Sequence, residues 1–101
     1  MEPVSSMEFQ LRDYRVKHGE MNEWVEEWRT KIYPLRLKVG FKVIGAWTRI
    51  EEDRFLWILG FEGDFAEAEK VYFASSERKA ISPDPVRHLV SASQTIIRGV
   101  L

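Results

Sequence analysis

Four stretches of the chain have the apolar and polar patterning of β-strands. In the first, which starts at position 7, Met7, Phe9 and Leu11 share one side, and Glu8, Gln10, Arg12 and Tyr14 share the other. This period of two is typical of a strand, and Lys17, His18 and Gly19 end it. Residues 41–50 and 54–62 predict a hairpin that turns through positions 51–53, and residues 91–101 predict a last strand.

The third of these strands is apolar on both of its alternating sides, because residues 55–61 carry no charge. An antiparallel strand with one face in water would alternate apolar and polar side chains. Both faces of this strand are therefore expected to be covered. A chain of 101 residues has helices for one face only, so the other face is predicted to meet a second copy of the protein in a homodimer.

Between positions 21 and 39 the apolar residues recur at helical spacing and form one stripe over about five turns. Acidic residues crowd the first half, and basic residues crowd the second half, which suits the helix dipole: these are Glu20, Glu23, Glu26 and Glu27, then Arg29, Lys31, Arg36 and Lys38. Pro34 cannot donate to the carbonyl of Thr30, so a kink is expected there. Gly40 is a natural end for the helix.

A second helix is predicted to begin after Asp64, because Asp64 and Glu67 have the spacing of a capping box. Ser75 is expected to cap a further short turn. Prolines on both sides of Asp84 predict a loop, followed by one helical turn over positions 86–89.

The resulting order is strand, helix, strand, strand, helix, strand. Right-handed crossovers then favour a ferredoxin-like α+β fold, in which a four-stranded antiparallel sheet has its first and third strands at the centre. We expect a single domain over residues 7–101, preceded by a flexible N-terminal tail over residues 1–6.

Composition excludes several classes of protein. Fifteen basic residues nearly balance sixteen acidic ones, so no nucleic acid or acidic membrane is expected as a partner. The absence of cysteine excludes disulfides, thiolate catalysis and cysteine-bound metals. The N-terminus lacks the features of a signal peptide, and no apolar run is long enough to span a bilayer. A soluble, cytoplasmic protein is therefore predicted.

Several short motifs follow one another in an order that resembles the NIPSNAP family of dimeric α/β-barrel proteins. They are Phe9-x-Leu11-Arg12-x-Tyr14, Lys17-x-Gly19-x-Met21, Trp24-x-x-x-Trp28 in the helix reaching Pro34, and Gly45-x-Trp47 after Gly40-Phe41. The resemblance covers residues 7–101. It implies a ferredoxin-like protomer whose sheet packs face to face with a second protomer, and it implies no particular reaction. The chain departs from the family at Trp57 and Leu59, where members often carry a His and a Trp.

The candidate ligand site is the more aromatic face of the sheet. The helix tryptophans are expected to meet the side with smaller residues, because close packing needs complementary volumes. Trp47 and Trp57 would then look toward the dimer partner and, with Arg12 and Tyr14, line a cavity for a small organic ligand. The alternative is a plain dimer core, in which Arg12 pairs with a carboxylate such as Glu8 or Glu62.

The two histidines have no spacing typical of a metal site, and no metal or cofactor is expected. His18 is interpreted as a turn residue. His88 is either an acid or base at the mouth of the cavity or a surface residue.

Two functions remain open from the sequence. One is binding of a small organic ligand, with the possibility of a cofactor-independent monooxygenase- or isomerase-like activity by analogy of fold. The other is a non-catalytic dimeric interaction module whose interface is filled by side chains.

Overall fold

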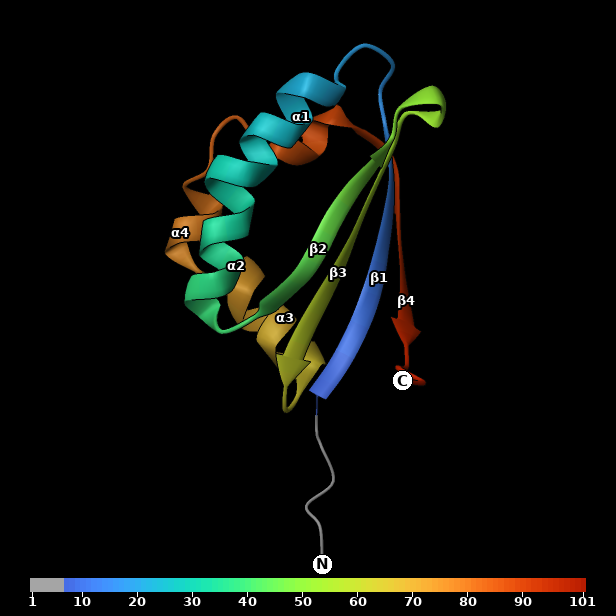
Figure 1. Ribbon diagram of the computed structural model, residues 1–101. Helices are drawn as coiled ribbons and strands as arrows, with labels where there is room; N and C mark the ends of the chain where they lie inside the picture. The colour runs from blue at the N-terminus through green and yellow to red at the C-terminus, as the bar shows by residue number, and fades with distance from the viewer. Residues whose placement is uncertain (1–6) are drawn as a thin grey trace, which may run out of the picture.

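Four antiparallel strands form one sheet in the order β2-β3-β1-β4 (Figure 1). The computed structural model describes residues 7–101, and the tail predicted over residues 1–6 lies outside the described part. The strands are β1 (Met7–Val16), β2 (Lys42–Arg49), β3 (Arg54–Glu62) and β4 (Leu89–Ile97). The predicted ferredoxin-like α+β fold is confirmed, with β1 and β3 at the centre of the sheet.

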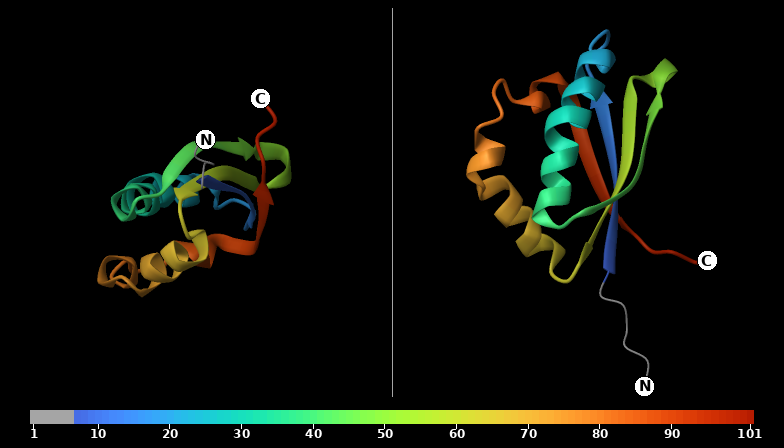
Figure 2. Two further views of the ribbon diagram at one scale, coloured as in Figure 1. Left: turned by 90° about the horizontal axis from the view of Figure 1, so that it is seen from below. Right: turned by 60° about the vertical axis from the view of Figure 1, so that its left-hand side comes forward.

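The helical segments lie on one face of the sheet (Figure 2). They are α1 (Met21–Glu27), the π-helical η1 (Trp28–Ile32), α2 (Tyr33–Val39), α3 (Phe65–Ala74), α4 (Ser76–Lys79) and the 3-10 turn η3 (Pro85–His88). A further 3-10 turn, η2 (Ile50–Glu52), lies instead at the tip of the hairpin between β2 and β3 (Figure 1). Within the described chain, none of these helical segments has the length and apolar character needed to cross a membrane.

Most of the predicted boundaries are confirmed by the local hydrogen bonds. The Asp64 carboxylate accepts from the Glu67 backbone N–H at 3.0 Å, and the Ser75 hydroxyl accepts from the Arg78 N–H at 3.1 Å. Gly40 ends α2 with a left-handed φ of 108°, which glycine adopts without a steric penalty. The last strand begins two residues earlier than predicted and ends at Ile97.

The prediction of which face of the sheet packs against the helices is wrong. Phe55, Trp57 and Leu59 are at most 2% exposed within the single chain, because they face the helices. The ring of Trp28 meets Trp57 edge to face at a centroid distance of 5.3 Å, and Trp24 meets Phe55 at 5.6 Å. Aromatic rings prefer such edge contacts, so large side chains pack against large ones, and the side with smaller residues is left open.

A bulge in β2 places Trp47 on the open face, opposite to Trp57. The register between β2 and β3 shifts between Val43 and Gly45, after which Ala46 pairs with Trp57 and Trp47 pairs with Leu56. The Trp47 ring lies over Gly45, where an added Cβ would come within 2.6 Å of the ring. This close approach explains the Gly-x-Trp spacing in physical terms.

The irregularity predicted at Pro34 takes the form of the π segment η1. The Tyr33 N–H donates to the Trp28 carbonyl, five residues back. The wider π turn precedes the proline that cannot donate to Thr30, and π segments of this kind are a known cause of helix irregularity.

Candidate functional site

A cavity of about 310 Å³ lies between the sheet and the protein's own helices. Three of the residues predicted from the sequence, Arg12, Tyr14 and Trp57, line it. The other lining side chains come from the helical segments and from β4: Trp24, Ile32, Arg36, Glu69, Tyr72, Phe73, Arg78, Val86, Leu89, Ala92 and Gln94. The cavity is thus formed within one chain, and not between the sheet and a dimer partner as the sequence suggested.

Arg12 enters the cavity because alternate residues of β1 face the helices. Its Nη2 donates to the Oε1 atom of Gln10 at 3.0 Å and lies 3.2 Å from Oε2 of Glu69. The carboxylate partner predicted for Arg12 was Glu8 or Glu62, whereas the structure shows an ion pair with Glu69 of α3. The sequence alone could not identify that partner, because the pairing depends on how α3 crosses the sheet.

Arg36 reaches the same cavity from α2, because of the π segment. Each step of four residues advances about 40° around a regular α-helix of 3.6 residues per turn. Three such steps from Trp24 would turn position 36 about 120° away from the sheet. The wider π turn offsets this drift, so Trp24, Trp28, Ile32 and Arg36 are all buried.

The Arg36 guanidinium is enclosed by aromatic rings and one carboxylate. Its Cζ lies 3.7 Å from the ring centroid of Tyr72 and 4.7 Å from that of Phe41. Its Nη1 donates to Oε1 of Glu69. Glu69 therefore bridges Arg12 and Arg36, and the site holds two guanidiniums on one carboxylate.

Arg78 completes a group of three guanidiniums. The Ser75 cap sets the start of α4, and the side chain of Arg78 turns inward, where its Nη2 donates to Oδ1 of Asp84 at 2.9 Å. Arg12, Arg36 and Arg78 are only 3%, 2% and 6% exposed. Sequence reasoning missed Arg36 and Arg78, although Arg36 lies four residues after Ile32 of the apolar stripe.

The rest of the cavity offers flat apolar walls with a few polar groups. The indole Nε1 of Trp57 is buried and has no hydrogen-bond partner among the described residues. Burial raises the pKa of the Tyr72 phenol, although the nearby Arg36 and Arg78 act in the opposite direction. Tyr72 therefore keeps its proton at neutral pH, and its ring is a wall of the cavity.

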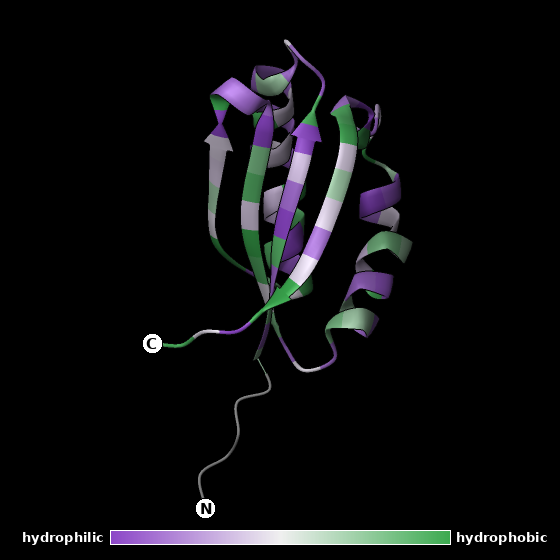
Figure 3. Cartoon of the chain, turned by 90° about the vertical axis from the view of Figure 1, so that its right-hand side faces the viewer, coloured by the Kyte–Doolittle hydropathy of each residue, from purple (hydrophilic) through white to green (hydrophobic). Residues whose placement is uncertain are grey.

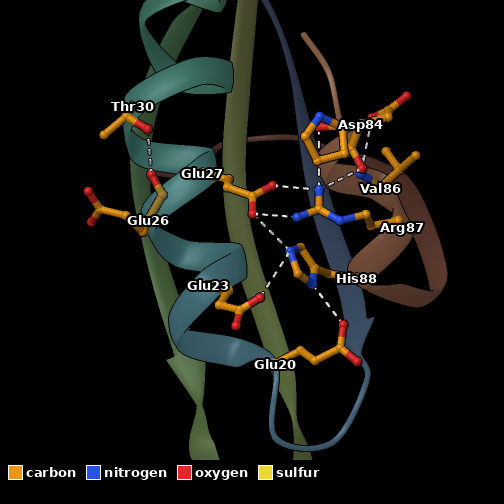
Figure 4. Close-up of polar contacts among 10 residues, drawn as sticks. Glu20, Glu23, Glu26, Glu27, Thr30, Asp84, Val86, Arg87 and His88 are labelled. Atoms are coloured by element: carbon orange, nitrogen blue, oxygen red, sulfur yellow. Dashed lines mark hydrogen bonds and ion pairs between the residues drawn. The ribbon is translucent and has the colours of Figure 1, made fainter.

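His88 is neither at the mouth of this cavity nor on the surface. It is 2% exposed, and Figure 4 shows it between acidic side chains of α1 and the turn before it. Its Nδ1 lies 2.7 Å from Oε1 of Glu20, and its Nε2 lies 3.0 Å from Oε2 of Glu27. A neutral imidazole has one N–H, so two such hydrogen bonds to carboxylates require the protonated ring.

The pKa values of this cluster fit a charged imidazolium. Burial lowers the pKa of His88, but the hydrogen bonds that its ring donates to Glu27 and Glu20 outweigh burial, and the pKa is raised above its ordinary value. The hydrogen bond from Arg87, with a smaller one from His88, lowers the pKa of Glu27 to about 2.

Glu23, Glu27 and His88 also have potential ligand atoms within 4.8 Å of one another. A metal ion there would have to compete with Arg87, whose Nη1 and Nη2 donate to the two carboxylate oxygens of Glu27, each at 2.8 Å. These charged groups already have partners in an ion-pair network that links η3 to α1.

Comparisons with known proteins agree with the architecture. The model of the NIPSNAP family matches residues 8–96. No curated protein matches the sequence.

Three solved structures illustrate the similarity of fold. A NIPSNAP family protein from Agrobacterium tumefaciens is 21% identical, with a TM-score of 0.81 over 91% of each chain. Another from the same organism, described as having unknown function, is 18% identical, with a TM-score of 0.80 over 95% of this chain and 90% of its own. A candidate antibiotic biosynthesis monooxygenase from Nitrosomonas europaea is 10% identical, with a TM-score of 0.69 over 99% of this chain and 96% of its own.

Proposed function

The chain belongs to the NIPSNAP family, and we propose that it binds a small organic ligand in the cavity between its sheet and its own helices. The observation that carries the proposal is a cavity of about 310 Å³ with aromatic walls and buried polar groups. Ligand pockets start at about this volume and combine apolar walls with a few polar groups that orient the ligand. A compact compound that is partly aromatic or bears a carbonyl group fits this description.

A reaction on the bound compound is a second step of the same proposal. The Nitrosomonas structure is described as a candidate monooxygenase, and its likeness to this chain is one of fold. Glu69 is the one carboxylate among the described lining residues. Proton transfer in a cofactor-independent monooxygenase- or isomerase-like reaction would therefore fall to Glu69.

We also propose that the open face of the sheet packs against a second copy of the chain. Figure 3 looks onto this face, with α1 and α2 behind it, and shows hydrophobic positions along the central strands. The apolar side chains whose register places them there are Phe9, Leu11, Leu56, Ile58 and Trp47. Trp47 is 53% exposed in the single chain, and an apolar surface of this kind is typical of an interface.

Native mass spectrometry of the protein purified from its source tests the ligand proposal. We expect a retained mass that denaturation releases, and a rise in melting temperature with compounds of the stated class. Ala92 lies on β4 and lines the cavity. Ala92→Trp would therefore fill part of the cavity and should abolish both the retained mass and the rise in melting temperature. Val90→Trp is the matched control, since Val90 is exposed on the same strand. If the unmodified protein retains nothing and no compound of a broad screen shifts its melting temperature, the interaction module is the better description.

A further inference from the structure

We infer that the ligand of this cavity is an organic anion, a flat carboxylate that is held by Arg12, Arg36 and Arg78. The inference rests on the proposed function and specifies its chemical class. Three lines of observation support it: the charge that the cavity buries, the donors that it leaves free, and the shape of its walls.

The cavity buries more positive than negative charge. Arg12, Arg36 and Arg78 are each at least nine-tenths buried, while Glu69 is the only acidic side chain among the described lining residues. Asp84 binds Arg78 from outside the cavity, and its side chain is half exposed. Buried cations without enough counter-charge are costly, so an occupant with a negative charge is favoured over a neutral one.

The unpaired polar atoms of the residues that line the cavity are mainly hydrogen-bond donors. The Nε atoms of Arg12, Arg36 and Arg78 are buried and make no hydrogen bond within the described part of the chain. Arg12 and Arg36 use their Nη atoms for Glu69, and the Nε–H of the same guanidinium has no acceptor among the described residues. A carboxylate accepts from guanidinium groups with short, charge-assisted hydrogen bonds, so it fits this set of donors.

The walls favour a flat ligand. The rings of Trp57, Tyr72 and Phe73 line the cavity together with Tyr14. Arg36 is held against the Tyr72 ring at 3.7 Å, so its position is fixed before a ligand arrives. Aromatic or conjugated acids of one or two rings combine the required charge with faces that stack on such walls.

Glu69 has a distinct role in this site. It is the resident counter-ion of Arg12 and Arg36, so it competes electrostatically with any incoming anion. Replacing its charge should strengthen the binding of an acid. A purely structural role for Glu69 would predict no such gain.

The test is calorimetric titration of the full chain with benzoate and 2-naphthoate, and with the neutral benzamide and 2-naphthamide as matched probes. We expect the acids to bind at least about tenfold more tightly than their amides, as charge-assisted hydrogen bonds require. Glu69→Gln should bind the acids more tightly still and leave the amides unchanged. Arg12→Met keeps the length of the side chain and should weaken the acids by about tenfold or more, with a smaller effect on the amides, which carry no charge.

Three results would overturn the inference, and they are distinguishable. Amides that bind as tightly as the acids, or acid binding that is indifferent to Arg12→Met, would show a ligand site without charge selection and leave the proposed function standing. Failure of the acids and the amides alike to bind the unmodified chain would count against both. If Glu69→Gln does not fold, the comparison of acids with amides and the Arg12→Met variant decide the question.

Discussion

At the scale of single residues, Trp28 is the centre of the aromatic core. Its ring stacks on Tyr33 at 5.3 Å and meets Phe55 and Trp57 edge to face at 5.1 and 5.3 Å. It therefore connects the long helical segment to the most apolar strand of the sheet. Few of these contacts can be replaced if the ring is removed, because neighbouring rings cannot collapse into the space without losing their own edge contacts.

Trp28→Ala should accordingly lower the free energy of unfolding by about 3–5 kcal/mol, the usual cost of truncating a buried aromatic residue. A urea titration followed by circular dichroism measures the loss. Val71→Ala is the control, because Val71 is exposed on α3, and it should cost less than about 0.5 kcal/mol. A loss below about 1 kcal/mol for Trp28→Ala would contradict the packing described here.

His88 makes the stability of the chain depend on pH. Its folded-state pKa is raised, so the stability that it contributes is complete below its unfolded pKa and is lost as the pH rises through the folded value. The carboxylates that face it are Glu20, Glu23 and Glu27, and the positive charge of Arg87 acts against its protonation. Because the pKa of Glu27 is lowered, the stability that its ionised carboxylate contributes persists until the pH falls toward about 2.

We therefore expect the free energy of unfolding to fall as the pH rises from about 6.5, the ordinary pKa of histidine, into the alkaline range, because the folded-state pKa of His88 is raised. His88→Gln should lose about 1.5–3 kcal/mol at the acid end of this range, the worth of a hydrogen bond to a charged group, and should flatten the profile. Urea titrations across the range measure both effects. If the pH dependence of the free energy of unfolding is unchanged in His88→Gln, a protonated His88 between Glu20 and Glu27 is excluded.

At the scale of elements, α3 depends on its N-terminal cap. Asp64 accepts from the Glu67 N–H and satisfies one of the donors that a helix start leaves free. This helix also carries Glu69 and Tyr72 into the cavity. The cap therefore helps to position part of the ligand site.

Asp64→Ala should destabilise the fold by about 0.5–2 kcal/mol, whereas Asp64→Asn, which keeps an acceptor oxygen, should cost much less. Thermal melts of the two variants at neutral pH measure the difference. Equal losses would mean that the charge at this position, and not the hydrogen bond, supports the helix.

Much of this element-level structure could be predicted from the sequence, because caps and strand alternation are local signals. Asp64, Ser75 and Gly40 each end or begin an element where the residue type suggests it. Which face of β3 packs against the helices could not be predicted in the same way. Both of its faces are apolar, and the outcome depends on how the aromatic rings of the helices fit against the strand.

The candidate site shows the same division between local and long-range information. Arg12, Tyr14 and Trp57 were identified because strand alternation places them on one face. Arg36 was interpreted only as one of the basic residues that suit the helix dipole, and a regular α-helix would have turned position 36 away from the sheet. Glu69 was missed because its pairing with Arg12 joins positions 57 residues apart in the sequence, and no local pattern encodes such a contact.

At the scale of the whole molecule, the sheet has one face inside the chain and one face outside it. The helices and the cavity occupy the first. The second face combines apolar residues with the ion pair of Arg54 and Asp13, whose Nη1 and Oδ1 atoms are 3.1 Å apart. Trp57 belongs to the inner face, so a charge at Trp57 would unfold the protomer and could not report on an interface. A test of the proposed homodimer has to change the outer face.

Ile58 meets that requirement, because its register partners Leu11 and Gly45 place it in the middle of the open face. Ile58→Glu should convert the dimer into a folded monomer, since an unpaired carboxylate cannot be buried in an apolar interface without a large cost. Light scattering after size-exclusion chromatography at low micromolar concentration should give about twice the chain mass of 11.9 kDa for the unmodified protein and about this mass for the variant. Val71→Glu, which introduces the same charge on the exposed side of α3, should remain dimeric.

A monomeric unmodified protein would contradict the proposal directly. A dimer that survives Ile58→Glu would place the interface elsewhere, because the centre of the open face could not then be buried.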